Sequence, residues 1–270
     1  MTAQSRVLGI DFSGGRDAGN NIWVSEAVVV ANGIEIESCQ RARHLPGGAV
    51  DRNRALRALV EHLAANSYAL AGLDFPFSLP ARLIPEQSWE EFVSTFVQRY
   101  PSPAFFRVNC TVRGDGRELK RGTEVEARVP FSAYNLRLYR QTYWGIRDVL
   151  HPLISNDAAR VIPIQAPCAQ KPVIAEICPA SILKREGLYR SYKGRGHELR
   201  QARKFIIKQL IERRAMRKPG VTILSRILDD TGGNALDAVI AAIGAARVVA
   251  NPDTMRTRNA LERIEARVYF

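Results

Sequence analysis

Four acidic residues stand at positions from which a folded chain could bring carboxylates together. Asp11 and Asp74 each end a short apolar run that reads as a buried strand. Glu176 lies within a later apolar run, and Asp237 lies in the first turn of the segment 234–250, "NALDAVIAAIGAARVVA", which is apolar almost all the way round. An ionised carboxylate that is buried alone is very costly, so Asp237 must have a partner.

The four acids could together bind a divalent cation. Neighbouring parallel strands end about 5 Å apart, and sites in open α/β sheets form at the carboxyl ends of the strands. Carboxylates this close cannot all stay ionised without a counter-ion. Mg²⁺ or Mn²⁺, as one ion or as two, would satisfy Asp11, Asp74, Glu176 and Asp237. Such ions can stabilise the attacking and leaving oxygens of a phosphodiester, so we expect metal-dependent hydrolysis of nucleic acid.

The elements that must position these acids indicate an α/β fold. Strand-like runs alternate with segments of helical periodicity, and Asn32-Gly33 between two β-branched runs predicts a hairpin. Residues 85–160 are less regular, and we expect a mostly helical insertion that covers the acidic edge within a single domain. The expected strands are 7–10, the two arms of the hairpin within 22–45, 68–74, 159–164, 172–179 and 264–270. The expected helices are 51–66, 89–100, 134–150, 197–215 and 234–250.

The positive charge of the chain points to a polyanionic partner. The formal net charge is +12, and the segment 184–218 holds 13 Lys or Arg against three Glu. We expect nucleic acid, held through its backbone without reading of sequence. The candidate contacts are Lys193, Arg200, Arg203 and Lys204. The alternative is that the basic side of the helix 197–215 is a solvated face with no ligand.

The turn after the first strand allows a second function. Ser13, Gly14 and Gly15 could cradle a phosphate with backbone amides. A strand, an aspartate and a glycine turn in this order also resemble the phosphate loop of the actin and sugar-kinase superfamily. A small-molecule phosphotransferase of that type is therefore an alternative, although those kinases use two copies of the core and this sequence shows one.

Four motifs resemble one known family. In order they are "VLGIDFSGG", "AGLDFPFSLP", "AEICPASIL" and "NALDAVIAAIGAA". Together they are similar to a family of predicted nucleases with a ribonuclease H-like fold, catalogued as domain of unknown function 429 and distantly similar to Holliday-junction resolvases. The segment "YKGRGHELR", with Lys193 and Arg200, is similar to a basic motif of that family. The resemblance implies a mixed five-stranded sheet flanked by helices, with Asp11, Asp74 and Asp237 at the positions of the catalytic acids.

The sequence departs from the resolvase pattern at one position. That branch has two aspartates three residues apart on the late helix, and here the earlier position is Asn234. Asp230 or Glu176 is then the expected replacement ligand. If neither fills the place, a nucleic-acid-binding protein with a degenerate site is the alternative reading.

Each acid also has a purely structural reading. Asp237 could stabilise the helix dipole three residues after Asn234 as the cap, and Asp11 and Asp74 could accept backbone amides in turns. Glu176 could form a buried ion pair with a cation, for which we considered Lys184, Arg185 and Lys193.

The cysteines, the apolar runs and the N-terminal segment together predict the cellular compartment. The four cysteines form no metal-ligand pattern. No apolar run has the length of a membrane span, and the N-terminal segment enters a strand-like run without the apolar core of a signal peptide. We therefore expect a cytoplasmic protein.

Overall fold

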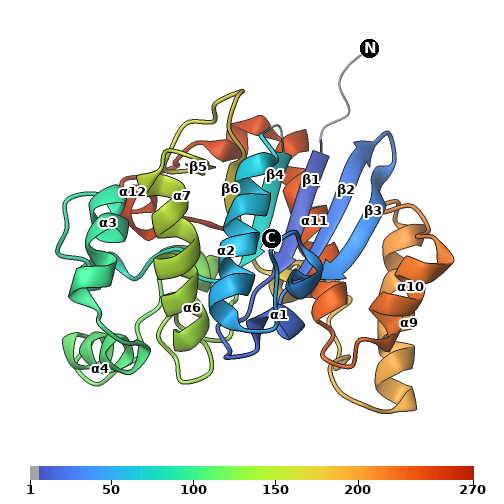
Figure 1. Ribbon diagram of the computed structural model, residues 1–270, viewed down its shortest axis with the longest axis horizontal. Helices are drawn as coiled ribbons and strands as arrows, with labels where there is room; N and C mark the ends of the chain where they lie inside the picture. Colours follow the sequence, from blue (N-terminus) through green and yellow to red (C-terminus); the bar gives the residue numbers. More distant parts are fainter. Residues whose placement is uncertain (1–5, 68) are drawn as a thin grey trace.

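The computed structural model of the protein describes residues 6–67 and 69–270, which form a seven-stranded mixed sheet between layers of helices (Figure 1). The strand order is β3–β2–β1–β4–β6–β5, and β7 pairs with the end of β6. The expected α/β class with a mixed sheet is confirmed. The strands are β1 Arg6–Asp11, β2 Trp23–Val30, β3 Gly33–Arg41, β4 Ala69–Asp74, β5 Arg160–Val161, β6 Val173–Ile177 and β7 Val268–Tyr269.

The sheet has the seven strands that the apolar runs predicted, two more than the five-stranded core that the resemblance implies, and two of them are very short. β5 and β7 have two residues each. The run 159–164 gives only the two residues of β5, since Pro163 has no amide hydrogen with which to continue a ladder. The hairpin at Asn32-Gly33 is confirmed, with Val30 paired to Gly33 across the turn. Tyr68, at which we expected the strand before Asp74 to begin, lies outside the described residues, as do residues 1–5 of the N-terminal segment.

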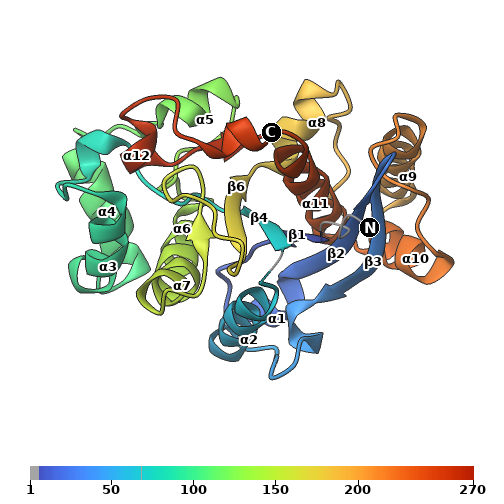
Figure 2. The same ribbon diagram turned by 90° about the horizontal axis from the view of Figure 1, so that it is seen from above.

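Two long helices cover opposite faces of the sheet (Figure 2). α11 (Asn234–Ala250) packs over β1, β2 and β4, and twelve of its seventeen residues are buried. α2 (Arg52–Ala65) belongs to the other face, where its apolar side joins Leu8 and Ile10 in one core cluster. Strand side chains therefore alternate between an α11 face and an α2 face of the sheet.

The segment between β4 and β6 is mostly helical, as expected. The helix 89–100 is confirmed as α3, but α4 was missed, although Ser102 caps its start and Pro103 occupies its first turn. The expected helix 134–150 begins only at Tyr139; Tyr134 lies before it, with its hydroxyl donating to the carbonyl of Arg117 and accepting the amide of Leu119. The helices here are α3 Trp89–Arg99, α4 Pro103–Arg113, α5 Gly122–Glu126, α6 Tyr139–Gly145, a π turn Ile146–Leu150 and α7 His151–Ser155.

The remaining helices frame the ends of the sheet. The expected helices 51–66, 197–215 and 234–250 are confirmed as α2, α9 and α11, whereas α10 was not expected. These other helices are α1 Ala18–Asn21, α8 Pro179–Arg185, α9 His197–Glu212, α10 Val221–Asp229 and α12 Glu262–Glu265, with 3₁₀ turns at Ala42–His44, Ala81–Leu83 and Pro252–Met255.

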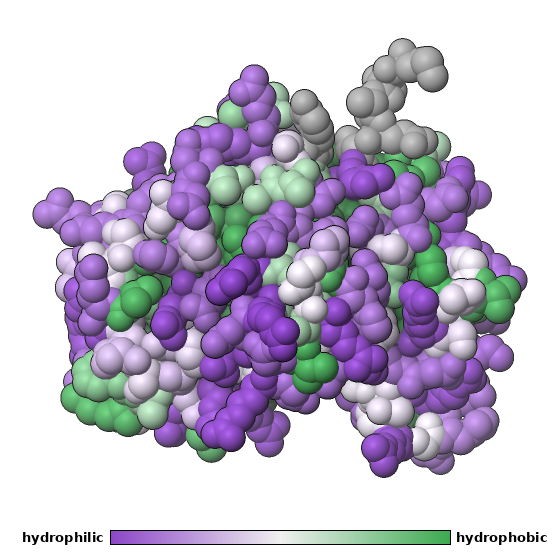
Figure 3. Space-filling view, in the orientation of Figure 1, coloured by the Kyte–Doolittle hydropathy of each residue, from purple (hydrophilic) through white to green (hydrophobic). Residues whose placement is uncertain are grey.

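The surface is largely hydrophilic, with an apolar patch over α4 in Figure 3. Phe105, Val108 and Val112 form that patch. Among the described residues no single helix is long and apolar enough to span a membrane. Taken together, α10 and α11 have the length and composition of a span, but the angle between them is 118°.

Candidate functional site

Asp11 and Asp74 end adjacent strands in the middle of the sheet. β1 and β4 are parallel, and their register pairs Asp11 with Asp74. Val7 and Leu70, which precede each aspartate by four residues, belong to the core cluster of α11. Because side chains alternate along a strand, both aspartates point to the α11 face. The sequence prediction that these two acids meet at one edge is confirmed.

Glycines bring α11 close enough to place Asp237 over the same edge. A Cβ on Gly9 would lie 2.0 Å from the carbonyl oxygen of Ala238, and one on Gly72 would lie 2.9 Å from that of Ala241. The helix backbone therefore rests directly on β1 and β4. Asp237, in the first turn of α11, is only 2% exposed.

The partners of Asp237 are Tyr192 and Lys193. The Tyr192 hydroxyl donates to Asp237 Oδ1 at 2.5 Å, and the Lys193 ammonium lies 2.5 Å from Oδ2. Lys193 was expected to hold nucleic acid, and Tyr192 was not singled out at all. The predicted partner of the buried Asp237 carboxylate is therefore the Lys193 ammonium, which supplies the opposite charge.

The three aspartates interact through their charges around this one ammonium. Burial raises the pKa of Asp11 well above its usual value, and the carboxylate of Asp237 raises it further. Burial and Asp237 likewise raise the pKa of Asp74, to about 7, although Lys193 opposes them. Burial lowers the pKa of Lys193, but Asp237 and Asp11 outweigh it and the net shift is upward. The site therefore holds more negative charge than its ammonium neutralises, and it favours uptake of a further cation or of protons.

Glu176 lines the same cavity as Asp11 and Asp74, and its charge adds to the raised pKa of Asp74, but its side chain belongs to the opposite face of the sheet. The register pairs Glu176 with Leu73, one residue before Asp74. Leu73 and Ile174 belong to the core cluster of the α2 face, so the alternation of β6 turns Glu176 to that face as well. The expectation that Glu176 joins the aspartates as a metal ligand does not agree with this geometry.

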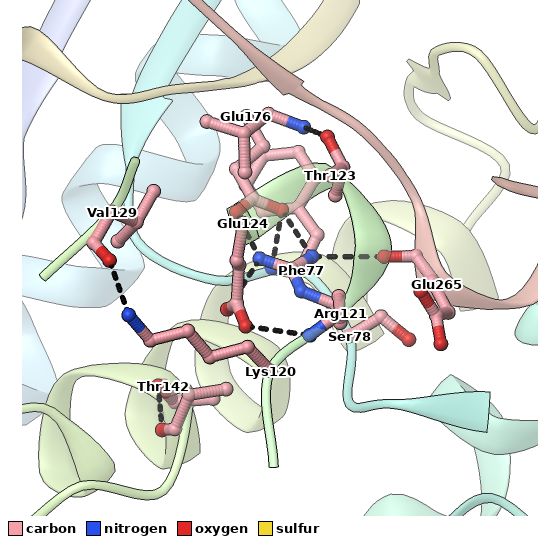
Figure 4. Close-up of polar contacts among 12 residues, drawn as sticks. Phe77, Ser78, Lys120, Arg121, Thr123, Glu124, Val129, Thr142, Glu176 and Glu265 are labelled. Atoms are coloured by element: carbon pink, nitrogen blue, oxygen red, sulfur yellow. Dashed lines mark hydrogen bonds and ion pairs between the residues drawn. The ribbon is translucent and has the colours of Figure 1, made fainter. Parts of the chain in front are cut away.

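The ion pair considered for Glu176 exists, but its partner is Arg121. Arg121 is fully buried and binds both carboxylate oxygens of Glu176, at 2.5 and 2.8 Å. Its guanidinium also donates to Glu124 and to the carbonyl of Glu265 (Figure 4). Glu176 in turn accepts the backbone amide of Phe77, in the loop that follows β4. Through these bonds, Arg121 of the insertion links the C-terminal segment around Glu265 to the carboxyl end of β6.

Lys184 and Arg185, the other cations considered for Glu176, lie elsewhere. They donate to the backbone carbonyls of Arg128 and Phe270. Arg121 sits in a polar stretch of weak periodicity, and nothing in the sequence marks it as the partner of a residue 55 positions away.

Asp230 and Asn234 hold the start of α11. Asp230 accepts the backbone amide of Ala235, with Arg41 3.9 Å away. Asn234 donates to the carbonyl of Asn21 and lines the cavity described below. Asp230 does not line that cavity, so the geometry gives it the role of a cap rather than that of the replacement ligand.

The turn of Ser13, Gly14 and Gly15 lies at the rim of the site. The Gly15 amide donates to Ser13 Oγ at 3.3 Å, so this amide is already used. A Cβ on Gly14 would lie 2.5 Å from the carbonyl oxygen of Arg140, which shows that α6 rests on the turn. The turn is better explained as a support for α6 than as a phosphate cradle.

The basic helix α9 differs from expectation in one important residue. Arg203 is only 2% exposed, and its guanidinium donates to the carbonyls of Leu228, Tyr192 and Gly194. The expectation that Arg203 contacts a nucleic-acid backbone does not agree with this burial, because the residues around α9 already bind its guanidinium. Arg200 pairs with Asp229 at 3.0 Å, and Lys204 is exposed.

A cavity of about 430 Å³ opens at the carboxyl ends of β1, β4 and β6. Asp11, Asp74 and Lys193 line one side of it, and Phe131 and Gln141 of the insertion line the other. Gln141 donates to the backbone carbonyl of Asp74 at 2.5 Å. The insertion thus forms a wall of the acidic site, as expected of a segment that covers it.

Cys178 also lines this cavity but is not poised as a nucleophile. Burial raises the pKa of its thiol to about 12. The thiol therefore stays protonated at neutral pH, and a thiolate is the reactive form.

Within the described part of the chain, no three His, Cys, Asp or Glu side chains are arranged so that they could hold a metal ion together. Comparison with known proteins gives no assignment, since no family model, curated protein or solved structure matches the chain. The resemblance carried by the four sequence motifs therefore remains a prediction.

Proposed function

We propose that the protein is a metal-dependent nuclease, built on a ribonuclease H-like core, that hydrolyses phosphodiester bonds of DNA or RNA. The observation that carries the proposal is the pairing of Asp11 with Asp74 in a cavity where Asp237 raises the pKa of both. Strand-end aspartates beside a late-helix aspartate are what the resemblance to that fold implies. The same arrangement is what a hard cation with oxygen ligands requires.

The donor set fits one Mg²⁺ or Mn²⁺ better than two. Asp11 and Asp74 would hold the ion, because Mg²⁺ commonly takes one or two carboxylates and completes its shell with substrate phosphates and waters. Asp237 is already paired with Lys193, and Glu176 with Arg121. A bound cation would neutralise charge on the phosphate and lower the barrier to attack at phosphorus.

The chain's own residues prepare the site for a phosphate. The Lys193 side chain is half-exposed and lines the same cavity as Asp11 and Asp74, so its ammonium can donate to a phosphate oxygen. Gln141 fixes the carbonyl of Asp74, and Glu176 fixes the loop after β4 through Phe77. These contacts hold the two aspartates in place before any substrate binds.

A cleavage assay tests the proposal. The protein would be incubated with labelled single-stranded, duplex and branched DNA and RNA, with Mg²⁺, Mn²⁺ or EDTA. We expect cleavage only with a divalent cation, and a loss of at least about 100-fold in Asp11→Asn and Asp74→Asn. Asp253→Asn makes the same chemical change at an exposed position outside the cavity and should cleave like the wild type.

The assay has two outcomes that contradict the proposal. Cleavage that survives both site substitutions would place the chemistry elsewhere. Binding of nucleic acid without any metal-dependent cleavage would favour the degenerate site that Asn234 suggests.

A further inference from the structure

The insertion carries a basic and aromatic face that the acidic site alone does not explain. Between Ala127 and Arg147 the sequence holds four arginines and no acid. Arg137 and Arg140 are exposed, and neither takes part in an ion pair within the described ranges. Arg147 pairs with Asp148 at 3.6 Å, so the unpaired positive charge of the segment is that of Arg137 and Arg140, which is left to solvent or to a ligand.

Arginines of this region stand over aromatic rings. Arg137 lies over Phe131 at 5.4 Å, and Arg140 lies over Tyr139 at 5.4 Å. Arg52 of α2 lies 3.6 Å from the ring centre of Trp144, and Arg147 lies 5.0 Å from it. Each of the three rings is partly exposed. Flat rings and guanidinium planes are the groups on which unpaired bases stack.

Residues of this region line two different cavities. Phe131 and Gln141 line the acidic cavity. Trp144 and Arg147 line a second cavity of about 690 Å³ between α2 and the helices α6 and α7, together with Arg57 and the acids Glu61 and Asp148. Both α2 and α6 face the viewer in Figure 1, and the corresponding region of Figure 3 is strongly hydrophilic.

Helix geometry joins the two ends into one track. Arg140, Trp144 and Arg147 are spaced by four and three residues, so they share one face of the continuous helix that α6 begins. That face rests on Gly14, three residues after Asp11. We call the residues Phe131, Arg137, Tyr139, Arg140, Trp144 and Arg147 the α6 track.

We propose that the α6 track binds single-stranded nucleic acid and leads its backbone to the acidic cavity. This inference rests on the proposed function, for which it names the substrate class. Rings that accept stacked bases favour an unpaired strand over a duplex, whose bases already stack on one another. The arginines supply the positive charge that a backbone requires. The inference also moves the nucleic-acid surface from α9, where Arg203 is buried, to the insertion.

The test measures binding without cleavage. Labelled oligothymidylate and oligouridylate of about 20 nucleotides, and a duplex of equal length, would be titrated in EDTA at several salt concentrations. For the wild type we expect tighter binding of the single strands than of the duplex. In Arg137→Ala/Arg140→Ala we expect about tenfold weaker binding and a salt slope smaller by about 1.4, or about 0.7 for each lost phosphate contact. The preferred oligonucleotide then identifies DNA or RNA.

Matched variants distinguish binding by the α6 track from non-specific attraction to the positive charge of the protein. Lys208→Ala/Lys218→Ala removes the same charge from exposed positions outside the track and should bind within about twofold of the wild type. Tyr139→Leu removes a ring but no charge, and should weaken single-strand binding without changing the salt slope.

Three results would overturn the inference: preference for the duplex, equal losses in the track and control variants, or no binding of any oligonucleotide. Failure of the proposed nuclease function gives a different result. It would appear as no metal-dependent cleavage, or as cleavage that survives Asp11→Asn, while binding of oligonucleotides in EDTA would be unchanged.

Discussion

Asp11 and Asp74 stand opposite one another as the last residues of two parallel strands, and both point to the face that α11 covers. Asp237 approaches them from that helix, and the Lys193 ammonium lies beside it. The account therefore depends on three features: the close approach of α11, the ammonium, and the charge of the aspartates.

The close approach of α11 predicts that Gly9 tolerates no side chain. In Gly9→Ala the new Cβ would meet the carbonyl of Ala238 at 2.0 Å, so the helix must shift. We expect a loss of about 1–3 kcal/mol in the free energy of unfolding, measured by urea denaturation. Gly122→Ala, at an exposed glycine with nothing nearer than 4.0 Å, should change stability by less than about 0.5 kcal/mol. Equal stability of the two variants would contradict the packing described.

The ammonium of Lys193 predicts a pH-dependent stabilisation. Lys193→Met leaves Asp237 buried without a cation, and we expect a loss of about 1–2 kcal/mol in the free energy of unfolding at pH 8, since the lysine is half-exposed. The loss should be smaller at pH 5, which is below the pKa of about 7 of Asp74, because the protonated Asp74 adds no negative charge to the site. Lys193→Arg keeps the charge and should retain most of the stability. A loss of equal size at both pH values would argue against charge as the cause.

The raised pKa of Asp74 predicts how stability changes with pH. The pKa is about 7 in the folded protein against 3.8 without these surroundings. Between these values the unfolded chain releases its proton while the folded chain keeps it, so the contribution of Asp74 to stability falls as pH rises. Asp74→Asn should therefore equal the wild type near pH 4 and exceed it by on the order of 2 kcal/mol at pH 8. Thermal unfolding of both proteins between pH 4 and pH 8 measures this difference. An Asp74→Asn variant that is less stable than the wild type at pH 8 would contradict the prediction.

The buried pair of Arg121 and Glu176 predicts a structural role rather than metal binding. Arg121→Met leaves Glu176 and Glu124 without their cation, and we expect a loss of about 3–5 kcal/mol in the free energy of unfolding. Adding Glu176→Gln should recover part of that loss, because one unpaired charge is removed. Urea denaturation of the two single variants and the double variant measures the coupling energy between Arg121 and Glu176. Losses that simply add would show that the two residues do not stabilise the fold as a pair.

Local sequence patterns predicted much of the fold. Asn32-Gly33 placed the hairpin, and the apolar runs before Asp11 and Asp74 placed two central strands. The run 234–250, which is apolar almost all the way round, gave the bounds of α11. These features succeeded because each depends on residues close together in the chain.

The failures of the sequence analysis involve contacts between distant segments. Glu176 lies on the opposite face of the sheet from Asp74 because it is paired with Leu73, and the sequence of a single strand does not reveal that register. Arg203 has the helical spacing of a surface residue, yet the loops of Tyr192 and Leu228 enclose it. Arg121 and Tyr192, the partners of two buried acids, carry no local signal.

The most direct test of the account is anomalous diffraction from crystals of the protein soaked in Mn²⁺ near pH 8, which is above the pKa of about 7 of Asp74. The account predicts one strong peak within coordination distance of both the Asp11 and the Asp74 carboxylates, and no such peak in crystals of Asp11→Asn. A saturating soak that leaves these two carboxylates without an ion, or that places the ion beside Glu176 instead, would contradict it.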